Sequence, residues 1–328
     1  MHDEKILKVL RSNTETHTSS DELCKVTGIS RAAVWKHIED LRKEGYDIEA
    51  SPHLGYKLVK IPDSLIPGEI MWKLKTKIIG RAVISYKKVD STNDSAYALA
   101  EKGIAEGTVI IAEEQTKGKG RHGRKWESPP KSGVYMSCII RPEMAPNEIA
   151  KITLLAAVAV AKAVRRFTGL NAMIKWPNDI LINGRKVCGI LTEMKAEQDS
   201  IDFIILGIGV NINTPISCLP KGGSSLKEEL HISSKTDSLS RVEFVKKILE
   251  SLEEEYSRLR IKGFKPIIDE WRSMSALPGS KIKVLLPNRT IEGEAHDIDS
   301  DGSLMVRLDS GVIEKVSSGD VVMLRQKD

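Results

Sequence analysis

The sequence predicts an α+β protein made of three parts: an N-terminal winged helix-turn-helix, a central domain with a mixed sheet, and a small C-terminal SH3-like β-barrel. Three observations support this prediction. The first sixty residues show a helical apolar period followed by a hairpin pattern, the middle mixes strands and helices without one-for-one alternation, and the last fifty contain only short strand patterns. The expected boundaries are 1–62, 63–276 and 277–328 of the 328 residues.

The N-terminal part has the signals of three helices and a hairpin. Ser19 and Glu22 have the spacing of a capping box, which marks the start of the second helix. Gly28 provides the turn, and Ser30 caps the third helix, which stops at Gly45. A tight turn before the third helix, followed by a hairpin, is typical of a winged helix-turn-helix. The first two helices are expected over 5–11 and 21–26, and the hairpin over 46–58.

The middle of the chain follows a proline-containing linker at 61–68. Its helices are too few to alternate with its strands, which favours a mixed sheet over a doubly wound parallel one. The third of these helices again opens with a capping box, Ser240 and Glu243. Strands are expected over 82–89, 108–113, 134–140, 172–175, 180–182, 186–194 and 202–211, and helices over 93–102, 147–167, 241–261 and 264–273.

The last fifty residues predict a small barrel, because their short strands are separated by Pro-Asn, Asp-Gly and Ser-Gly turns. The strands are expected over 281–286, 290–297, 303–308, 312–316 and 321–324.

Composition predicts a cytoplasmic protein with no membrane segment. Hydrophobic residues make up 41% and charged residues 29% of the chain, and the net charge is only +5. The four cysteines are scattered, which argues against a disulfide framework and a zinc site. The polar N-terminus shows no secretory signal. The most apolar helical run, 152–164, contains Lys162 and is too short to span a bilayer, so it predicts a buried core helix.

The loop from Thr116 to Trp126 is the main candidate for chemistry, because it combines three glycines with five Lys or Arg residues. Its glycines spell the dinucleotide-binding pattern GxGxxG, but that pattern requires a helix to begin there, and Pro129 and Pro130 follow instead. Glycine lets backbone N–H groups approach a polyphosphate, and arginine grips phosphate oxygens in pairs. A solvated basic loop is the alternative interpretation.

Several motifs together resemble the biotin–protein ligases, in particular the bifunctional kind that also represses the biotin operon. The family loop GRGRxGRxW appears here as Gly118-Lys-Gly-Arg-His-Gly-Arg-Lys-Trp126, and the KWPND motif is complete from Lys175 to Asp179. Further matches in the same order are Asp90-Ser-Thr-Asn93, Gln115, Lys186-Val-Cys-Gly-Ile-Leu191 and Gly207-Ile-Gly-Val-Asn-Ile-Asn213.

This resemblance implies a two-step reaction that uses biotin, ATP and Mg²⁺. The biotin carboxylate attacks the α-phosphate of ATP to give biotinyl-5′-adenylate and pyrophosphate. A lysine of a biotin carboxyl carrier protein, from acetyl-CoA carboxylase or a related carboxylase, then attacks the mixed anhydride. Such catalysis depends on positioning and charge neutralisation and needs no enzyme nucleophile.

The resemblance also implies roles for individual residues, with Lys186 and Arg121 as the catalytic ones. Considered without the family, Ser91 caps a helix, Lys186 follows a turn, residues 176–179 form a tight turn, and Trp126 packs in the core. No metal ligands are identified, although Lys175, Asn178 and Asp179 would face the phosphates and Mg²⁺. The implied biotin residues are Ser91, Thr92, Asn93, Gln115, Lys119, Gly120, Arg121, Lys186 and Gly189; the implied nucleotide residues are Gly118, Arg121, Arg124, Trp126, Lys175, Asn178, Asp179 and Asn211.

One position departs from the family loop, since Lys119 stands where the family usually has arginine. Lysine keeps the positive charge but lacks the planar fork that binds two oxygens. The sequence therefore predicts weaker retention of the adenylate than an arginine would give.

The third helix predicts contacts with operator DNA. Residues 1–60 contain ten Lys or Arg and ten Asp or Glu, so non-specific attraction to phosphates should be modest. Trp35 is interpreted as a packing residue and not as a base contact. By the family's logic, the adenylate-loaded protein forms a homodimer on a two-fold operator; a winged helix used only for protein contacts is the alternative. The expected DNA-binding residues are Ser30, Arg31, Ala32, Lys36 and Lys57.

Two functional hypotheses of different classes follow from the sequence. The first is a ligase with a transcriptional repressor attached, which the complete phosphate-handling motifs favour. The second is a ligand-sensing transcription factor without ligase activity. Within the enzyme class, a lipoate–protein ligase is the alternative, since that family shares the catalytic fold.

Overall fold

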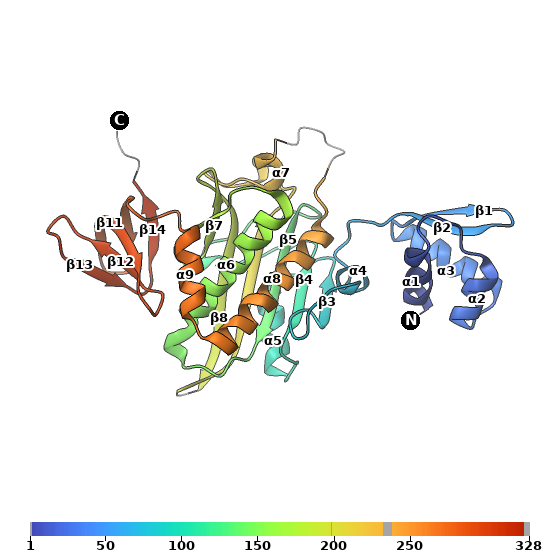
Figure 1. The fold of residues 1–328 in the computed structure, drawn as a ribbon, viewed down its shortest axis with the longest axis horizontal. Helices are drawn as coiled ribbons and strands as arrows, with labels where there is room; N and C mark the ends of the chain where they lie inside the picture. The colour runs from blue at the N-terminus through green and yellow to red at the C-terminus, as the bar shows by residue number, and fades with distance from the viewer. Residues whose placement is uncertain (1, 198, 232–237, 325–328) are drawn as a thin grey trace. The chain divides into compact units, whose positions relative to one another are not determined.

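A computed structural model describes residues 2–197, 199–231 and 238–324. The chain divides into two compact units, Met1–Ser64 and Leu65–Asp328, and the second contains both the central and the C-terminal sheets (Figure 1). Within the described residues, no helix has the length and apolar character needed to cross a membrane. The predicted boundary between the second and third domains stays a prediction.

The N-terminal unit has the predicted three helices and hairpin. Ser19 accepts a hydrogen bond from the backbone N–H of Glu22, and Ser30 accepts one from Ala33, so both predicted caps are confirmed. The core consists of apolar side chains from all three helices and the hairpin, among them Ile6, Leu23, Val34, Ile38 and Leu58. The elements are α1 (His2–Ser12), α2 (Ser20–Thr27), α3 (Arg31–Lys43), β1 (Asp47–Ser51) and β2 (Gly55–Lys60).

The second unit is built on a seven-stranded sheet with the order β3-β4-β5-β9-β8-β7-β6. Only β3 and β4 pair in parallel, and the other neighbours are antiparallel, so the predicted mixed sheet is confirmed. The strands are β3 (Ala82–Tyr86), β4 (Thr108–Ala112), β5 (Gly133–Ile140), β6 (Met173–Lys175), β7 (Asp179–Ile182), β8 (Arg185–Glu197) and β9 (Ser200–Asn211).

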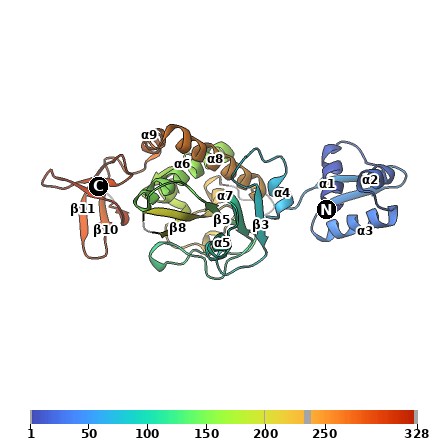
Figure 2. The same cartoon turned by 90° about the horizontal axis from the view of Figure 1, so that it is seen from below.

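Helices cover the two faces of this sheet unequally. Helices α6 (Ile149–Thr168), α8 (Arg241–Lys262) and α9 (Lys265–Met274) pack on one face over the main core, and α5 (Thr92–Glu101) lies on the other (Figure 2). The start of α5 and the middle strands β8 and β9 therefore lie on the sparsely covered face. Two short helices, α4 (Pro67–Met71) and α7 (Leu226–Glu229), complete the unit.

The expected linker was partly wrong. Pro67 and Gly68 lie in the first turn of α4, because proline fits the start of a helix, where its missing N–H costs nothing. Helices α4 and α7 were not predicted. All the predicted helices and strands are found, and their ends differ from the prediction by up to three residues.

The C-terminal residues form the predicted five short strands, paired in one antiparallel sheet with the order β13-β12-β11-β10-β14. This sheet contacts the central part: the indole N–H of Trp176 donates to the Gly302 carbonyl at 3.0 Å, and Arg272 pairs with Asp297 at 2.9 Å. The strands are β10 (Lys281–Leu285), β11 (Thr290–Ile298), β12 (Leu304–Arg307), β13 (Ile313–Val316) and β14 (Asp320–Met323).

Candidate functional site

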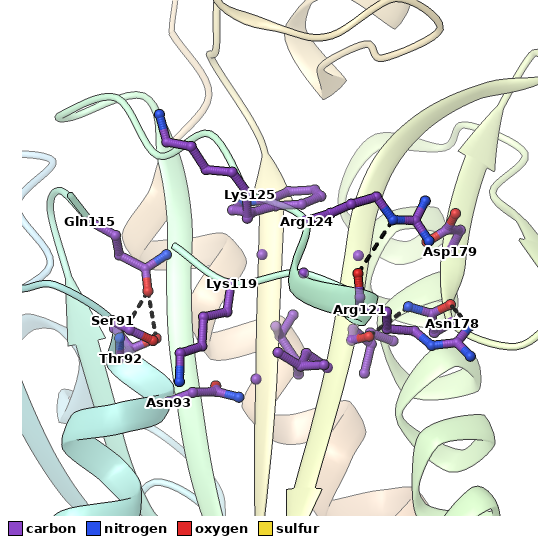
Figure 3. Close-up of a pocket in the computed structure, with 18 of the residues that line it drawn as sticks. Ser91, Thr92, Asn93, Gln115, Lys119, Arg121, Arg124, Lys125, Asn178 and Asp179 are labelled. Atoms are coloured by element: carbon purple, nitrogen blue, oxygen red, sulfur yellow. Dashed lines mark hydrogen bonds between the residues drawn. The ribbon is translucent and has the colours of Figure 1, made fainter. Parts of the chain in front are cut away.

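A cavity of about 440 Å³ opens above β8 and β9, between the N-terminus of α5 and the loop 116–126 (Figure 3). It gathers segments that are far apart in sequence, including the turn before β7 and one residue of the C-terminal sheet. All nine residues that the resemblance assigns to biotin line it, and five of those assigned to the nucleotide do so as well. The predicted lining residues are Ser91, Thr92, Asn93, Gln115, Lys119, Gly120, Arg121, Arg124, Trp126, Asn178, Asp179, Lys186 and Gly189.

The polar end of the cavity is the start of α5. Ser91 caps this helix by accepting from the backbone N–H of Asp94 at 3.4 Å, as its spacing predicts. Gln115 accepts from both the backbone N–H and the hydroxyl of Thr92, at 2.9 and 3.1 Å, and donates its amide N–H to Ser128 at 2.9 Å. Helix capping and cavity lining therefore occur at the same residues, as the sequence allowed.

A buried chain of hydrogen bonds continues below Thr92. The Ser137 hydroxyl lies 2.8 Å from the Thr92 hydroxyl and 2.6 Å from Asn93 Oδ1, while the Asn93 amide donates to Glu193 at 2.6 Å. Asn93 packs so closely on β9 that a Cβ at Gly207 would lie 2.2 Å from its Oδ1. Because a carboxylate only accepts, Glu193 fixes which way the Asn93 amide faces. Sequence reasoning did not identify Ser137 or Glu193.

The glycine-rich loop folds back on itself and does not begin an α-helix, so the rejection of the dinucleotide fold is confirmed. Lys119 and Lys125 form an antiparallel bridge, and residues 121–123 make a single 3₁₀ turn. One side of the loop is tied to the region of α5: Lys117 pairs with Asp90 at 2.8 Å, and Lys119 pairs with Asp94. The hydrogen bond to Asp94 raises the pKa of Lys119, which keeps its ammonium group charged.

The other side of the loop contacts the C-terminal sheet. Arg121 donates to the Gly319 carbonyl at 3.1 Å and to Asn178 Oδ1 at 3.3 Å, while Arg124 pairs with Asp320. Figure 3 shows Lys119 directed toward α5 and both arginines on the side of Asn178. Burial lowers the pKa of Arg121, although an arginine stays protonated at physiological pH. Asp320 lies almost two hundred residues from the loop, and sequence reasoning did not identify it.

Trp126 stands between this cavity and a second one of about 400 Å³, and it lines both. Its ring lies over two strand glycines: a Cβ at Gly189 would approach it to 2.9 Å and a Cβ at Gly209 to 2.5 Å. Its indole N–H is buried and has no hydrogen-bond partner among the described residues. The ring is therefore packed against the sheet and also lines both cavities.

Lys186 also lines both cavities. Its Nζ lies 2.6 Å from the Asp179 carboxylate and 5.4 Å from the centroid of the Trp126 ring. The second cavity adds Lys175 and Asn211, two of the three predicted nucleotide residues that the first lacks. Burial lowers the pKa of Lys175. Gly118 lies outside both cavities and packs against the Trp126 carbonyl, where a Cβ would come within 2.5 Å.

The turn before β7 is fixed to strand β8 beside the first cavity. The Asn178 amide donates to the Ile190 carbonyl at 2.7 Å, and Asn178 is largely buried. Among the described residues, no group of three or more His, Cys, Asp or Glu side chains could hold a metal ion by itself. Asp179 lines both cavities, and its carboxylate is already paired with Lys186.

The predicted DNA-binding residues lie on the N-terminal unit and not at this site. Ser30, Arg31, Ala32 and Lys36 are exposed at the start of α3, and Lys57 is half-buried on β2. The interpretation of Trp35 as a packing residue was wrong, since 57% of it is exposed. Its position on α3 turns it away from the core stripe that contains Val34, Ile38 and Leu41.

Comparison with protein families gives three matches along the chain. Residues 85–211 match the biotin/lipoate A/B protein ligase family, residues 2–57 match an HTH domain, and residues 279–324 match the biotin protein ligase C-terminal domain.

Known proteins show the same order of parts. The chain is 39% identical to the bifunctional ligase/repressor BirA of Bacillus subtilis over 303 residues, which cover 92% of this chain and 93% of that protein. It is 30% identical to BirA of Escherichia coli over 320 residues, covering 96% and 95% of the two chains. Among solved structures, the biotin protein ligase of Aquifex aeolicus in complex with biotin and ATP superposes with a TM-score of 0.63 at 28% identity, covering 75% of this chain and all of that one.

Proposed function

The chain belongs to the biotin protein ligase family, with the domain composition of its bifunctional ligase/repressors, and from that premise we propose that it biotinylates a carrier protein and represses transcription. The observation that carries the ligase proposal is the pair of adjoining cavities. Both are lined by cations, the first also contains the small polar groups at the start of α5, the second contains Lys175, and Lys186 lines both. Biotin occupies the first cavity and the nucleotide the second.

In the first step, an oxygen of the biotin carboxylate attacks the α-phosphorus of ATP, and the bond to the pyrophosphate oxygen breaks. Ser91, Thr92, Asn93 and Gln115 hold the ureido ring, whose N–H and carbonyl groups match their donors and acceptors. Lys186 lies at the junction, where it neutralises charge on both the carboxylate and the α-phosphate. Preorganised charge of this kind, together with alignment of the two reactants, supplies the catalysis.

Cationic side chains of the loop and of β6 bind the nucleotide phosphates. Arg121 and Arg124, which line the first cavity, exchange their contacts with Asn178 and Asp320 for phosphate oxygens, and Lys175 faces the second cavity. Magnesium would enter bound to ATP, because it is usually held by one or two carboxylates together with substrate phosphates. Asp179 is the carboxylate that would bind this magnesium ion, with Asn178 next to it in the sequence.

In the second step, the ε-amine of an acceptor lysine attacks the carbonyl carbon of the mixed anhydride, and AMP leaves with the bonding electrons. The acceptor is a biotin carboxyl carrier protein of a carboxylase, since related proteins from Mycobacterium tuberculosis and Paracoccus denitrificans are biotin–[acetyl-CoA-carboxylase] ligases. The four cysteines are free in the structure and carry no role in either step, which suits a reducing cytoplasm.

Exchange of labelled pyrophosphate into ATP tests the first step directly. We expect exchange that depends on biotin and that lipoate neither supports nor inhibits. Lipoate-dependent exchange would favour the lipoate–protein ligase alternative. Absence of exchange with either acid would leave the ligand-sensing transcription factor as the remaining hypothesis.

Repression is the second half of the proposal. Adenylate formation promotes a homodimer, which binds a two-fold operator through its two winged helices. In a gel shift with the promoter of the organism's own biotin genes, biotin plus ATP should give tighter binding than biotin alone. Equal binding under the two conditions would contradict the corepressor model.

Replacement of Lys119 by arginine should slow the release of the adenylate. The planar guanidinium can bind two oxygens where the lysine offers a single charge, and we expect dissociation about fivefold slower, equivalent to about 1 kcal/mol. Asp94 provides an ion-pair partner for either side chain. Release of radiolabelled adenylate from the loaded protein measures the effect.

Lys117→Arg is the matched control for this experiment. Lys117 lies in the same loop and pairs with Asp90, but it does not line the first cavity. Its replacement should leave adenylate release unchanged. Unchanged or faster release from the Lys119→Arg protein would contradict the prediction.

A further inference from the structure

The exposed face of α3 contains a large aromatic residue that the functions described so far do not use. Along this helix the buried positions Val34, Ile38 and Leu41 face the core of the N-terminal unit. The exposed positions form a separate stripe beside the buried one, with the spacing i, i+1, i+4 and i+5 of one helical face. That stripe consists of Arg31, Ala32, Trp35 and Lys36.

Trp35 is the only large apolar residue in this stripe, and 57% of it is exposed. A tryptophan covers about 150–250 Å² when it is buried, and its indole suits a contact that is apolar in the middle and polar at the edge. Tryptophan is also enriched at binding interfaces and among the residues that contribute most to their affinity. The residue therefore has the character of an interface side chain that lacks its partner in the isolated unit.

The charges around Trp35 indicate the chemistry of the partner. Arg31 lies one turn before it and Lys36 directly after it, so the indole is flanked by two cations. Arg31 also pairs with Asp21 at 2.6 Å, an exposed pair that a stronger anion can replace at little cost. Small Ala32 lies on the same face and allows close approach. A polyanion with apolar surface between its charges, such as a DNA groove, is complementary to this arrangement.

The N-terminal unit has no net positive charge, which makes an apolar contact by the indole more important for DNA affinity. Residues 1–60 carry ten basic and ten acidic side chains, so their summed attraction to phosphates is weak. Tight binding to an operator then requires contacts that do not depend on net charge. Apolar packing against base edges is such a contact, and the major groove offers it through thymine methyl groups.

We propose that Trp35 is a DNA-contacting residue that packs its indole against apolar base edges in the major groove, between the phosphate or base contacts of Arg31 and Lys36. This inference rests on the proposed operator binding, and it extends that proposal by adding a contact that does not act through charge. It also replaces the sequence-based interpretation of Trp35 as a packing residue that does not contact bases.

The test compares binding of full-length variants to one DNA probe over a range of salt concentrations. The probe is a duplex selected from a random-sequence pool by the wild-type protein in the presence of biotin and ATP. We expect Trp35→Ala to bind it about 10- to 100-fold more weakly, with an unchanged slope of log affinity against log salt. Lys36→Ala should instead reduce the size of that slope by about one.

Two controls separate a DNA contact from a defect elsewhere. Val59→Ala removes another exposed apolar side chain of the same unit, 49% exposed on β2, and should leave DNA affinity unchanged. Biotin-dependent pyrophosphate exchange should be the same in the wild type and all three variants, because none of these residues lies in the ligase unit.

Different outcomes distinguish failure of this inference from failure of the function on which it rests. If the wild type selects no duplex, operator binding and the role of Trp35 are both wrong. If the wild type selects a duplex that Trp35→Ala binds equally well, only the role of Trp35 is wrong. A Trp35→Ala protein that binds the duplex more weakly because it no longer dimerises with biotin and ATP would assign the indole to a protein contact and overturn the proposal.

Discussion

Replacing Lys186 by methionine should reduce adenylate formation by about 100- to 1000-fold, the usual cost of removing one preorganised group that stabilises transition-state charge. Methionine keeps the length of the side chain and removes the ammonium group that lies 2.6 Å from Asp179 and lines both cavities. The loss should appear mainly in kcat of pyrophosphate exchange. Biotin binding itself should weaken less, because the ureido contacts at the start of α5 are untouched.

Lys195→Met is the matched control. Lys195 lies on the same strand, β8, and its side chain is as exposed as that of Lys186, at 35%. It pairs with Glu101 and lines neither cavity. Its replacement should therefore leave exchange within about twofold of the wild type, since exposed ion pairs contribute little. An equal loss in the two variants, or full activity in Lys186→Met, would remove Lys186 from the chemistry.

Replacing Gly209 by alanine should raise the KM for biotin by about 10- to 100-fold, the equivalent of about 1–3 kcal/mol of overpacking. The added Cβ would lie 2.5 Å from Cε2 and Nε1 of Trp126, too close for either group to remain in place. The backbone of Trp126 is fixed, because its N–H donates to the Gly118 carbonyl at 2.8 Å. The ring must therefore move toward a cavity and narrow it. Steady-state kinetics with biotin as the varied substrate measure the effect.

Gly68→Ala provides the control for a glycine substitution as such. A Cβ at Gly68 meets nothing within 4 Å, and the residue lies in the first turn of α4, away from both cavities. We expect its KM for biotin to match that of the wild type. A Gly209→Ala protein with normal KM for biotin would show that the wall formed by Trp126 does not define the pocket.

The local chemistry of the site followed from the sequence because it depends on neighbours along the chain. Ser91 caps α5 through a backbone N–H three residues away, and Gly28 and Ser30 shape the turn before α3. The absence of a helix after the loop also followed, since Pro129 and Pro130 exclude one. The apolar run that contains Lys162 was correctly predicted to be a buried helix, although the partners of this lysine were not.

Ion-pair and hydrogen-bond partners that lie far apart along the chain could not be predicted from a single sequence. Lys162 is buried among Glu254, Glu255 and Glu270, at 2.6–3.2 Å, because α6 packs against α8 and α9. Glu193 reaches Asn93 across a hundred residues, and Asp320 reaches Arg124 across almost two hundred. Each pair exists only because two elements meet in the folded chain, and neither residue of a pair has a pattern that identifies the other.

Trp35 shows why composition alone misleads about burial. Tryptophans are usually buried, so a tryptophan on a helix is expected to face the core. Its position one residue after Val34 was already visible in the sequence and places it beside the stripe formed by Val34, Ile38 and Leu41, not within it. The helical period was the better guide in this case, because a rigid helix can present only one face to a small core.

The sequence by itself determined the class of fold, the order of the parts, and the loop of glycines and cations that identifies the chemistry. These depend on local backbone preferences and on apolar period, which act within a few residues. Only the tertiary structure decided how Trp126 divides two cavities, which acids hold the loop, and which residues face outward on α3. These features arise from long-range packing, where the geometry of the sheet brings together side chains whose spacing along the chain carries no information.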